Sequence, residues 1–372
     1  MEFVYLLPTA HSMKIIIVMF LMCFLTMEAY GEKRKQVILE GKKAVVGIDL
    51  AGGGIFDFHL SGQGLNPLIW NYPPEGDLNP REMGHFVCFD RWGSSSEAEQ
   101  KHGMPSHGEA AYMVWKVLSV PVKKDGVITV ELLCELPMAG MKLKRTLSLS
   151  ENASAFTVSD EITNVNKLVK AYNIVQHPSI APPFLDENVI VDANISKGFA
   201  QWGNLPYPEE PVLYWPEIAY KGKLVDLRRL FGDESPNVVS FPLSEGAEFG
   251  WVTASNPAQD LMIGYIWEVD DYPWLNLWRQ AKDGKPFARG LEFGTTGLHQ
   301  PFTAIFEKQK IFGRSLFTHL DAGASTTKSY TAFLTKIPQD FKGVADVSYR
   351  AETLVVKEVG EKNAREITIP LK

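Results

Sequence analysis

The chain has 372 residues, of which 45% are hydrophobic and 22% charged, so it is long and apolar enough to bury a sizeable core. Its formal net charge of −7 argues against nucleic acid as a partner, because nucleic-acid binding needs a basic face. Its aromatic content of 11% suits a β-rich core and also suits carbohydrate binding, in which flat rings stack on sugars.

Residues 1–31 have the features of a signal peptide. A positive charge precedes an unbroken apolar run at 15–26, and Ala29-Tyr30-Gly31 offers a small-x-small cleavage site. The apolar run is short for a membrane span, and Met13 is a possible alternative start. Cys23 would permit a lipoprotein anchor, but a bulky residue precedes it where a small one is needed. We therefore expect a periplasmic or secreted protein without a membrane span in the mature chain.

Strand patterns recur from residue 36 onward, and sustained helical periodicity is nearly absent. Asp125-Gly126 is a strong hairpin signal between two such patterns. The predicted strands cover residues 37–49, 54–60, 86–89, 112–122, 127–136, 141–150, 155–164, 171–175, 188–192, 248–254, 261–268, 302–306, 315–320, 325–334 and 353–359.

Two stretches interrupt the strands. Residues 61–110 are rich in Gly, Pro, Asn and Ser, and residues 196–236 are rich in Pro, Trp and Tyr. Long irregular loops inside a domain tend to be functional. Because no convincing linker or internal repeat is present, we expect one domain over residues 36–372. The many strands predict an all-β fold of stacked antiparallel sheets.

Three separated positions carry acid–base groups. His107 follows a Gly- and Pro-rich loop, His177 ends an apolar strand and is fixed by Pro178, and Glu292 stands in an apolar run between glycines. Two imidazoles and a carboxylate are what proton transfer near neutral pH requires. Each alone also has an ordinary explanation, such as a surface histidine, a core histidine or an exposed strand glutamate.

Other side chains are candidates for binding. Arg91 offers a planar fork of donors for a hydroxyl or carboxylate, or it pairs with a nearby acid. Gln176 can hydrogen-bond a hydroxyl. Trp278 can stack on a sugar, as can Trp202, Trp267 and Trp274, although core packing explains most of these four tryptophans. Cys88 and Cys134 would be allowed to form a disulfide after export, although their apolar surroundings favour buried free thiols. No cysteine-based or helical zinc motif is present, and we expect no metal site.

In this order and spacing, these segments resemble the galactose mutarotase (aldose 1-epimerase) superfamily over roughly residues 37–335. Residues 84–92 resemble the segment that delivers a sugar-binding arginine, here Arg91. His107-Gly108 resembles the first histidine motif, Gln176-His177-Pro178 stands in place of an Asn-His pair, and residues 291–295 stand in place of the catalytic glutamate segment. Asp226 and Asp233 are candidates, on spacing, for the sugar-binding aspartate of that family.

The resemblance implies an antiparallel supersandwich and an enzyme that interconverts sugar anomers without a cofactor; the signal-peptide features add the expectation that this enzyme is exported. The resemblance also implies that Glu292 is the general base, that His177 protonates the ring oxygen and that His107 assists. A non-catalytic carbohydrate-binding protein and a lyase-like, polysaccharide-processing enzyme stay open, because the same fold hosts several functions. The expected partner is a mono- or oligosaccharide, and the expected state is a monomer or dimer.

Overall fold

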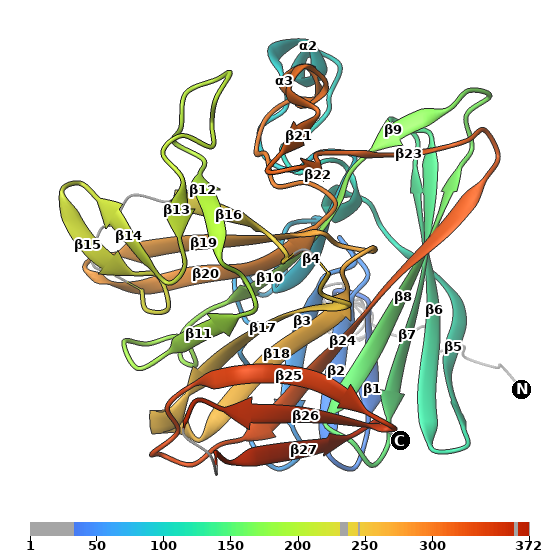
Figure 1. The fold of residues 1–372 in the computed structure, drawn as a ribbon. Helices are drawn as coiled ribbons and strands as arrows, with labels where there is room; N and C mark the ends of the chain where they lie inside the picture. Colours follow the sequence, from blue (N-terminus) through green and yellow to red (C-terminus); the bar gives the residue numbers. More distant parts are fainter. Residues whose placement is uncertain (1–32, 231–236, 245, 361–363, 372) are drawn as a thin grey trace, which may run out of the picture.

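The computed structural model describes residues 33–230, 237–244, 246–360 and 364–371, and antiparallel strands dominate it (Figure 1). The predicted signal peptide and Asp233 lie outside the described residues. Within the described ranges, no helix has the length and apolar character needed to cross a bilayer.

The larger sheet has ten strands and carries the pocket described below. In spatial order they are β1 (Gln36–Glu40), β2 (Ala44–Asp49), β3 (Ile55–Leu60), β4 (His85–Phe89), β10 (Ile174–Ile180), β20 (Lys285–Gly294), β19 (Trp274–Lys282), β16 (Asn237–Pro242), β12 (Lys197–Ala200) and β13 (Leu213–Tyr214).

The second large sheet has eight strands. Its order is β11 (Ile190–Ala193), β17 (Phe249–Asn256), β18 (Leu261–Glu268), β24 (Ser325–Lys336), β8 (Ala155–Asn164), β7 (Met141–Ser150), β6 (Val127–Leu136) and β5 (Lys116–Lys124). The side chains of β7 alternate in burial as period-2 patterning requires.

Smaller elements surround the two large sheets. A three-stranded sheet at the C-terminal end comprises β25 (Val344–Arg350), β26 (Thr353–Glu358) and β27 (Glu366–Pro370). The short pairs are β14 (Glu217–Tyr220) with β15 (Lys223–Asp226), β9 (Lys170–Tyr172) with β23 (Thr318–Leu320), and β21 (Lys310–Ile311) with β22 (Arg314–Ser315). The helices are α2 (Glu97–Lys101), α3 (Phe302–Lys308) and the 3-10 turns Ala110–Tyr112 and Pro257–Gln259.

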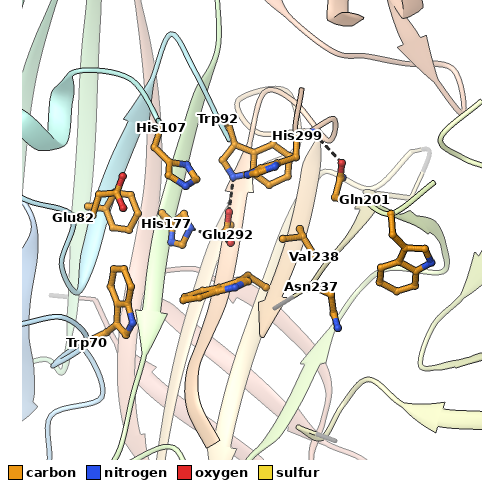
Figure 2. A pocket seen from close by; sticks show the side chains of 13 residues that line it. Trp70, Glu82, Trp92, His107, His177, Gln201, Asn237, Val238, Glu292 and His299 are labelled. Carbon is orange, nitrogen blue, oxygen red and sulfur yellow. Dashed lines mark hydrogen bonds and ion pairs between the residues drawn. The ribbon is translucent and has the colours of Figure 1, made fainter. Parts of the chain in front are cut away.

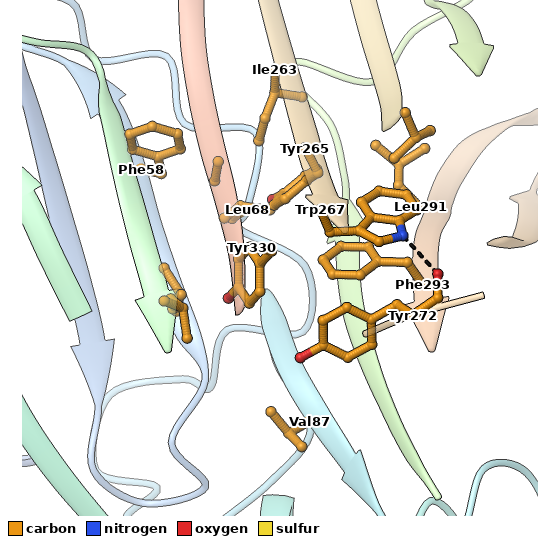
Figure 3. Close-up of a cluster of buried hydrophobic side chains, with 14 of the residues drawn as sticks. Phe58, Leu68, Val87, Ile263, Tyr265, Trp267, Tyr272, Leu291, Phe293 and Tyr330 are labelled. Carbon is orange, nitrogen blue, oxygen red and sulfur yellow. Dashed lines mark hydrogen bonds between the residues drawn. The ribbon is translucent and has the colours of Figure 1, made fainter. Parts of the chain in front are cut away.

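The main core is formed by side chains from both large sheets (Figure 3). Phe293 of β20 stacks on Trp267 of β18 with 4.2 Å between ring centroids, and Tyr330 of β24 meets the same phenylalanine edge-on. The Trp267 indole donates to the backbone oxygen of Tyr272 at 2.7 Å, so its one polar atom is satisfied. The sheets therefore share one interior, as a sandwich requires.

A buried ionic group also crosses this interior. Arg145 of β7 donates to Asp160 of β8 through Nε at 2.8 Å and Nη2 at 2.7 Å, and both side chains are fully buried. Gln176 of β10 accepts from Arg145 at 3.1 Å and donates to Asp160 at 2.9 Å and to Tyr272 at 3.1 Å. Because a buried ion pair is costly unless its groups are hydrogen-bonded, Gln176 helps to satisfy the pair while linking the two sheets.

The structure confirms the all-β antiparallel class, and the strands predicted at 127–136, 141–150, 155–164 and 261–268 agree to the residue. The strand predicted at 302–306 is wrong, because this segment is helix α3, whose buried residues Phe302 and Ile305 are three positions apart. Residues 37–49 form two strands, not one, since a turn at Gly41 separates them. Cys88 and Cys134 are buried and free.

Candidate functional site

A pocket of about 470 Å³ lies on the face of the ten-stranded sheet opposite the shared core (Figure 2). Adjacent strand residues point to opposite faces, so a strand can supply the core and the pocket in alternation. The lining is mainly aromatic, with histidines and carboxylates among the rings. It comprises Trp70, Glu82, Phe86, Trp92, His107, His177, Gln201, Trp202, Asn237, Val238, Trp278, Glu292 and His299.

His177 and Glu292 meet on the neighbouring strands β10 and β20. The pairing runs from Gln176 opposite Phe293 to Ser179 opposite Gly290, which places His177 across from Glu292. Nε2 of the imidazole lies 3.1 Å from Oε1 of the carboxylate. This contact is within ion-pair distance but is not aligned as a hydrogen bond, and Oε1 has no hydrogen-bond partner among the described residues. That atom is therefore a buried acceptor without a described partner at the wall of the pocket.

The surroundings of this pair fix both side chains. Oε2 of Glu292 accepts from the Trp92 indole at 2.6 Å. The His177 ring stacks on Phe86 with 4.2 Å between centroids, and its Nδ1 lies 2.9 Å from the Ser179 hydroxyl. A hydroxyl can donate or accept, so this contact permits either tautomer of the imidazole. The ring is held in place while its proton can move.

Burial sets the charge state of the pair. It raises the pKa of Glu292 to about 8, against the lowering effect of the Trp92 hydrogen bond. It also lowers the pKa of His177 well below the usual range, and the neighbouring histidines act in the same direction. At neutral pH the pair therefore carries one proton, which resides on the carboxyl group in the absence of a ligand.

Gly290 makes room for the carboxylate. It lies two residues before Glu292 on β20, so both positions face the pocket. A Cβ atom at this glycine would stand 2.6 Å from Oε1 of Glu292 and 3.1 Å from Cβ of Trp278. A glycine is therefore required at position 290, because the carboxylate of Glu292 lies too close to leave room for a side chain there.

His107 is held as a neutral hydrogen-bond donor. Its backbone is left-handed, with φ of 61°, an uncommon conformation for a non-glycine residue. The backbone N–H of Gly93 donates to its Nδ1 at 3.2 Å, and Sγ of Cys88 lies 3.3 Å from the same nitrogen. Nδ1 is therefore the acceptor and Nε2 carries the hydrogen. Because burial lowers its pKa to about 3, His107 stays uncharged across the neutral range.

The lining residues that were not predicted as site residues include Trp92, His299 and Glu82. The His299 ring meets Trp92 edge-on at 4.8 Å and lies 5.8 Å from His107. Its backbone N–H donates to Gln201, and burial lowers its side-chain pKa to about 4. Glu82 accepts from the Tyr112 hydroxyl at 3.0 Å, and burial raises its pKa to about 7. His299 and Glu82 belong to no local motif, whereas Trp92 ends the segment 84–92 and directly follows the predicted Arg91.

The structure brings His107, His177, Glu292 and Trp278 to the pocket but places Arg91 and Gln176 elsewhere. Arg91 is paired with Glu99 and with Asp90, and its guanidinium lies 4.4 Å from the Phe302 ring centroid. Gln176 points into the core because it precedes His177 in the same strand.

Two further predictions concern Asp226 and metal binding. Asp226 does not line the pocket, and one of its carboxylate oxygens accepts from the backbone of Arg228. The described residues contain no group of three or more His, Cys, Asp or Glu side chains placed to hold a metal ion. The pocket thus offers proton transfer, hydrogen-bond donation and aromatic stacking.

Solved structures with the same fold are numerous, but sequence similarity to them is low. No protein-family model and no curated protein sequence matches the chain. A galactose mutarotase related enzyme from Lactobacillus acidophilus is 14% identical, with a TM-score of 0.59, and the match covers 83% of this chain and 100% of that one. A galactose mutarotase-like protein from Clostridium acetobutylicum is 15% identical, with a TM-score of 0.59 and coverage of 82% and 96%.

A galactose mutarotase-like protein from Lactobacillus casei is 18% identical, with a TM-score of 0.56, and the match covers 81% of this chain and 100% of that one. These similarities extend over nearly the full length of the solved proteins. The chain therefore has the galactose mutarotase-like fold that its sequence predicts.

Proposed function

We propose that this protein is an exported, mutarotase-like enzyme that interconverts the α and β anomers of a sugar. The observation that carries the proposal is the contact between His177 and Glu292, 3.1 Å apart and nearly inaccessible at the base of an aromatic pocket. Opening a cyclic sugar requires one group to remove the proton of the C1 hydroxyl and another to protonate the ring oxygen. This pair supplies both groups.

The reaction conserves the single proton of the pair. Transfer of that proton from Glu292 to His177 gives a carboxylate and an imidazolium. Glu292 then takes the proton of the C1 hydroxyl while His177 gives its proton to the ring oxygen, and the bond between C1 and the ring oxygen breaks. Rotation about the C1–C2 bond and the reverse transfers close the ring as the other anomer. Each positioned proton-transfer group contributes roughly two to four orders of magnitude in rate.

His107 has a different role from the proton carriers. Its Nε2–H is fixed by the backbone donor at Nδ1, and its low pKa prevents it from gaining a proton near neutral pH. It donates a hydrogen bond to the ring oxygen of the sugar, on which negative charge develops as the bond to C1 breaks. Trp92 and Trp278 offer faces on which the apolar side of the sugar ring stacks.

The composition of the pocket favours this reaction over polysaccharide cleavage by elimination. A lyase needs a cation to neutralise the uronate carboxylate. The described residues that line the pocket include no arginine, lysine or tyrosine. The described lining residues therefore favour anomer exchange over elimination.

The test is anomer exchange of aldoses measured by NMR, with optical rotation of freshly dissolved sugars as a second readout. We expect the wild-type protein to accelerate exchange of at least one common aldose. We expect Glu292→Gln and His177→Asn each to reduce the rate by about 10²–10⁴. Exchange at the buffer rate for all common hexoses and pentoses would contradict the proposal. Sugar binding that survives Glu292→Gln, without exchange by the wild type, would instead identify a carbohydrate-binding protein.

A further inference from the structure

The pocket contains a second carboxylate that the proposed reaction does not use. Glu82 lies in the loop before β4, and in Figure 2 it and Glu292 stand on either side of the His177 ring. Its Oε1 accepts from the Tyr112 hydroxyl at 3.0 Å, which holds the side chain at the pocket wall. The charge of Glu82 contributes to the raised pKa of Glu292, after desolvation by burial.

Burial raises the pKa of Glu82 to about 7, so at pH 7.5 this carboxylate is mostly ionised, and no cation among the described lining residues balances it. The three histidines of the pocket have lowered pKa values and stay neutral near pH 7. Arg91 is occupied by Glu99 and Asp90 outside the pocket. Arg279 contacts the side chain of Asn237, whose amide oxygen, when turned to accept, lies 2.7 Å from Nη2.

Aromatic rings complete the walls on the side of Glu82. Trp70 stacks on Phe86 at 6.0 Å and meets Trp278 edge-on at 5.6 Å. Aromatic faces attract cations through their quadrupoles, and desolvation strengthens this attraction. Carboxylates combined with such faces form an environment suited to an ammonium group and unsuited to a second anion. The buried, unpartnered Oε1 of Glu292 independently marks the same pocket as a ligand site.

We infer that the pocket selects sugars by charge, accepting an amino sugar in preference to a neutral aldose and rejecting uronates, with Glu82 as the selecting residue. This inference rests on the proposed function for its kinetic readout but not for its binding readout. The protonated amine lies against Glu82 and the aromatic rings, and the anomeric carbon lies at Glu292 and His177. A uronate would instead bring a further carboxylate beside Glu82, in a pocket whose described lining residues include no cation.

The experiment compares glucosamine, glucose and glucuronate at pH 7.5, by anomer exchange and by NMR binding titration, in the wild type and in Glu82→Gln. In the wild type we expect kcat/KM to fall in that order, with at least about tenfold between the first and the last. In Glu82→Gln we expect the glucuronate-to-glucose ratio to rise about tenfold and the glucosamine-to-glucose ratio to fall. The substituted amide can still accept from Tyr112, so the loop stays in place.

Glu135→Gln is the matched control, because Glu135 is an exposed carboxylate on β6 paired with Lys116. It should keep the wild-type order. Turnover of glucuronate equal to or above that of glucose, or ratios unchanged by Glu82→Gln, would overturn the inference. If no sugar is turned over, the proposed reaction is contradicted. The charge selection is then tested by binding alone, and affinities that fall from glucosamine through glucose to glucuronate would support it. The absence of that order in binding would then overturn it.

Discussion

The indole of Trp92 donates a 2.6 Å hydrogen bond to Oε2 of Glu292, joining a loop residue to a strand residue 200 positions later. The bond favours the ionised carboxylate and opposes the desolvation that raises its pKa. Trp92→Phe keeps the ring and removes the donor. We expect the alkaline limb of the exchange rate to move to higher pH and the maximal rate to fall about tenfold. Trp278→Phe, which alters a pocket indole not bonded to Glu292, should leave that limb in place.

The exchange rate of the wild type should depend on pH through the single proton that Glu292 and His177 share. The rate should fall as pH rises through about 8, because Glu292 loses the proton that the pair needs. On the acid side it should persist well below the usual histidine pKa, since burial lowers the pKa of His177. Anomer exchange between pH 4 and 10 measures both limbs. A bell-shaped profile with its acid limb near 6.5 would contradict this charge assignment.

Stability should depend on pH through the same carboxyl group. Its folded-state pKa of about 8 exceeds the ordinary value of 4.5, so its contribution is fully present below about 4.5 and is lost as pH rises through about 8. Glu292→Gln cannot ionise. Its melting temperature should therefore rise relative to wild type between these pH values, by an amount corresponding to a few kcal/mol. Thermal unfolding across this range tests the prediction, and a difference independent of pH would count against it.

Gly290→Ala should disable the site without unfolding the protein. The added methyl group would stand 2.6 Å from Oε1 of Glu292 and would displace the carboxylate. We expect the exchange rate to drop by about 10²-fold, as misplacement of a reacting group does elsewhere. Gly64→Ala is the control, because a Cβ there meets nothing within 4 Å. Circular dichroism should show both variants folded; full activity of Gly290→Ala would refute the argument.

Gln176→Leu should reduce stability and spare catalysis. The side chain belongs to the Arg145–Asp160 group in the core, and its loss leaves those buried groups with fewer partners. We expect a loss of about 1–3 kcal/mol in unfolding free energy and a kcat/KM within a few-fold of wild type. Gln176→Asn, which keeps an amide, should lose less. A large rise in KM at unchanged stability would contradict this assignment and would indicate that Gln176 contributes to substrate binding.

The sequence predicts the hairpins well because their signals are local. The Asp125-Gly126 turn and the period-2 alternation of residues 127–164 require no information from distant parts of the chain. The strand predicted at 302–306 is wrong because a short apolar run fits a strand or a helix equally. The two buried residues are three positions apart, and this spacing distinguishes the helix from a strand.

The site residues that the sequence predicts are likewise those with a local signal. His107, His177 and Glu292 stand in distinctive local settings, whereas His299 and Glu82 reach the pocket only through the tertiary fold. The position of Gln176 could have been predicted from strand geometry. A residue adjacent to His177 in a strand must face the other side of the sheet.

Strand β10 places Gln176 in the ionic group of the core and His177 in the pocket, on successive residues. A single inserted or deleted residue within this strand would exchange the two faces, burying the imidazole in the core and exposing the amide to the ligand. We therefore expect a length change in β10 to disrupt the core and the pocket together, whereas a substitution at one position of the strand alters only the face to which its side chain points.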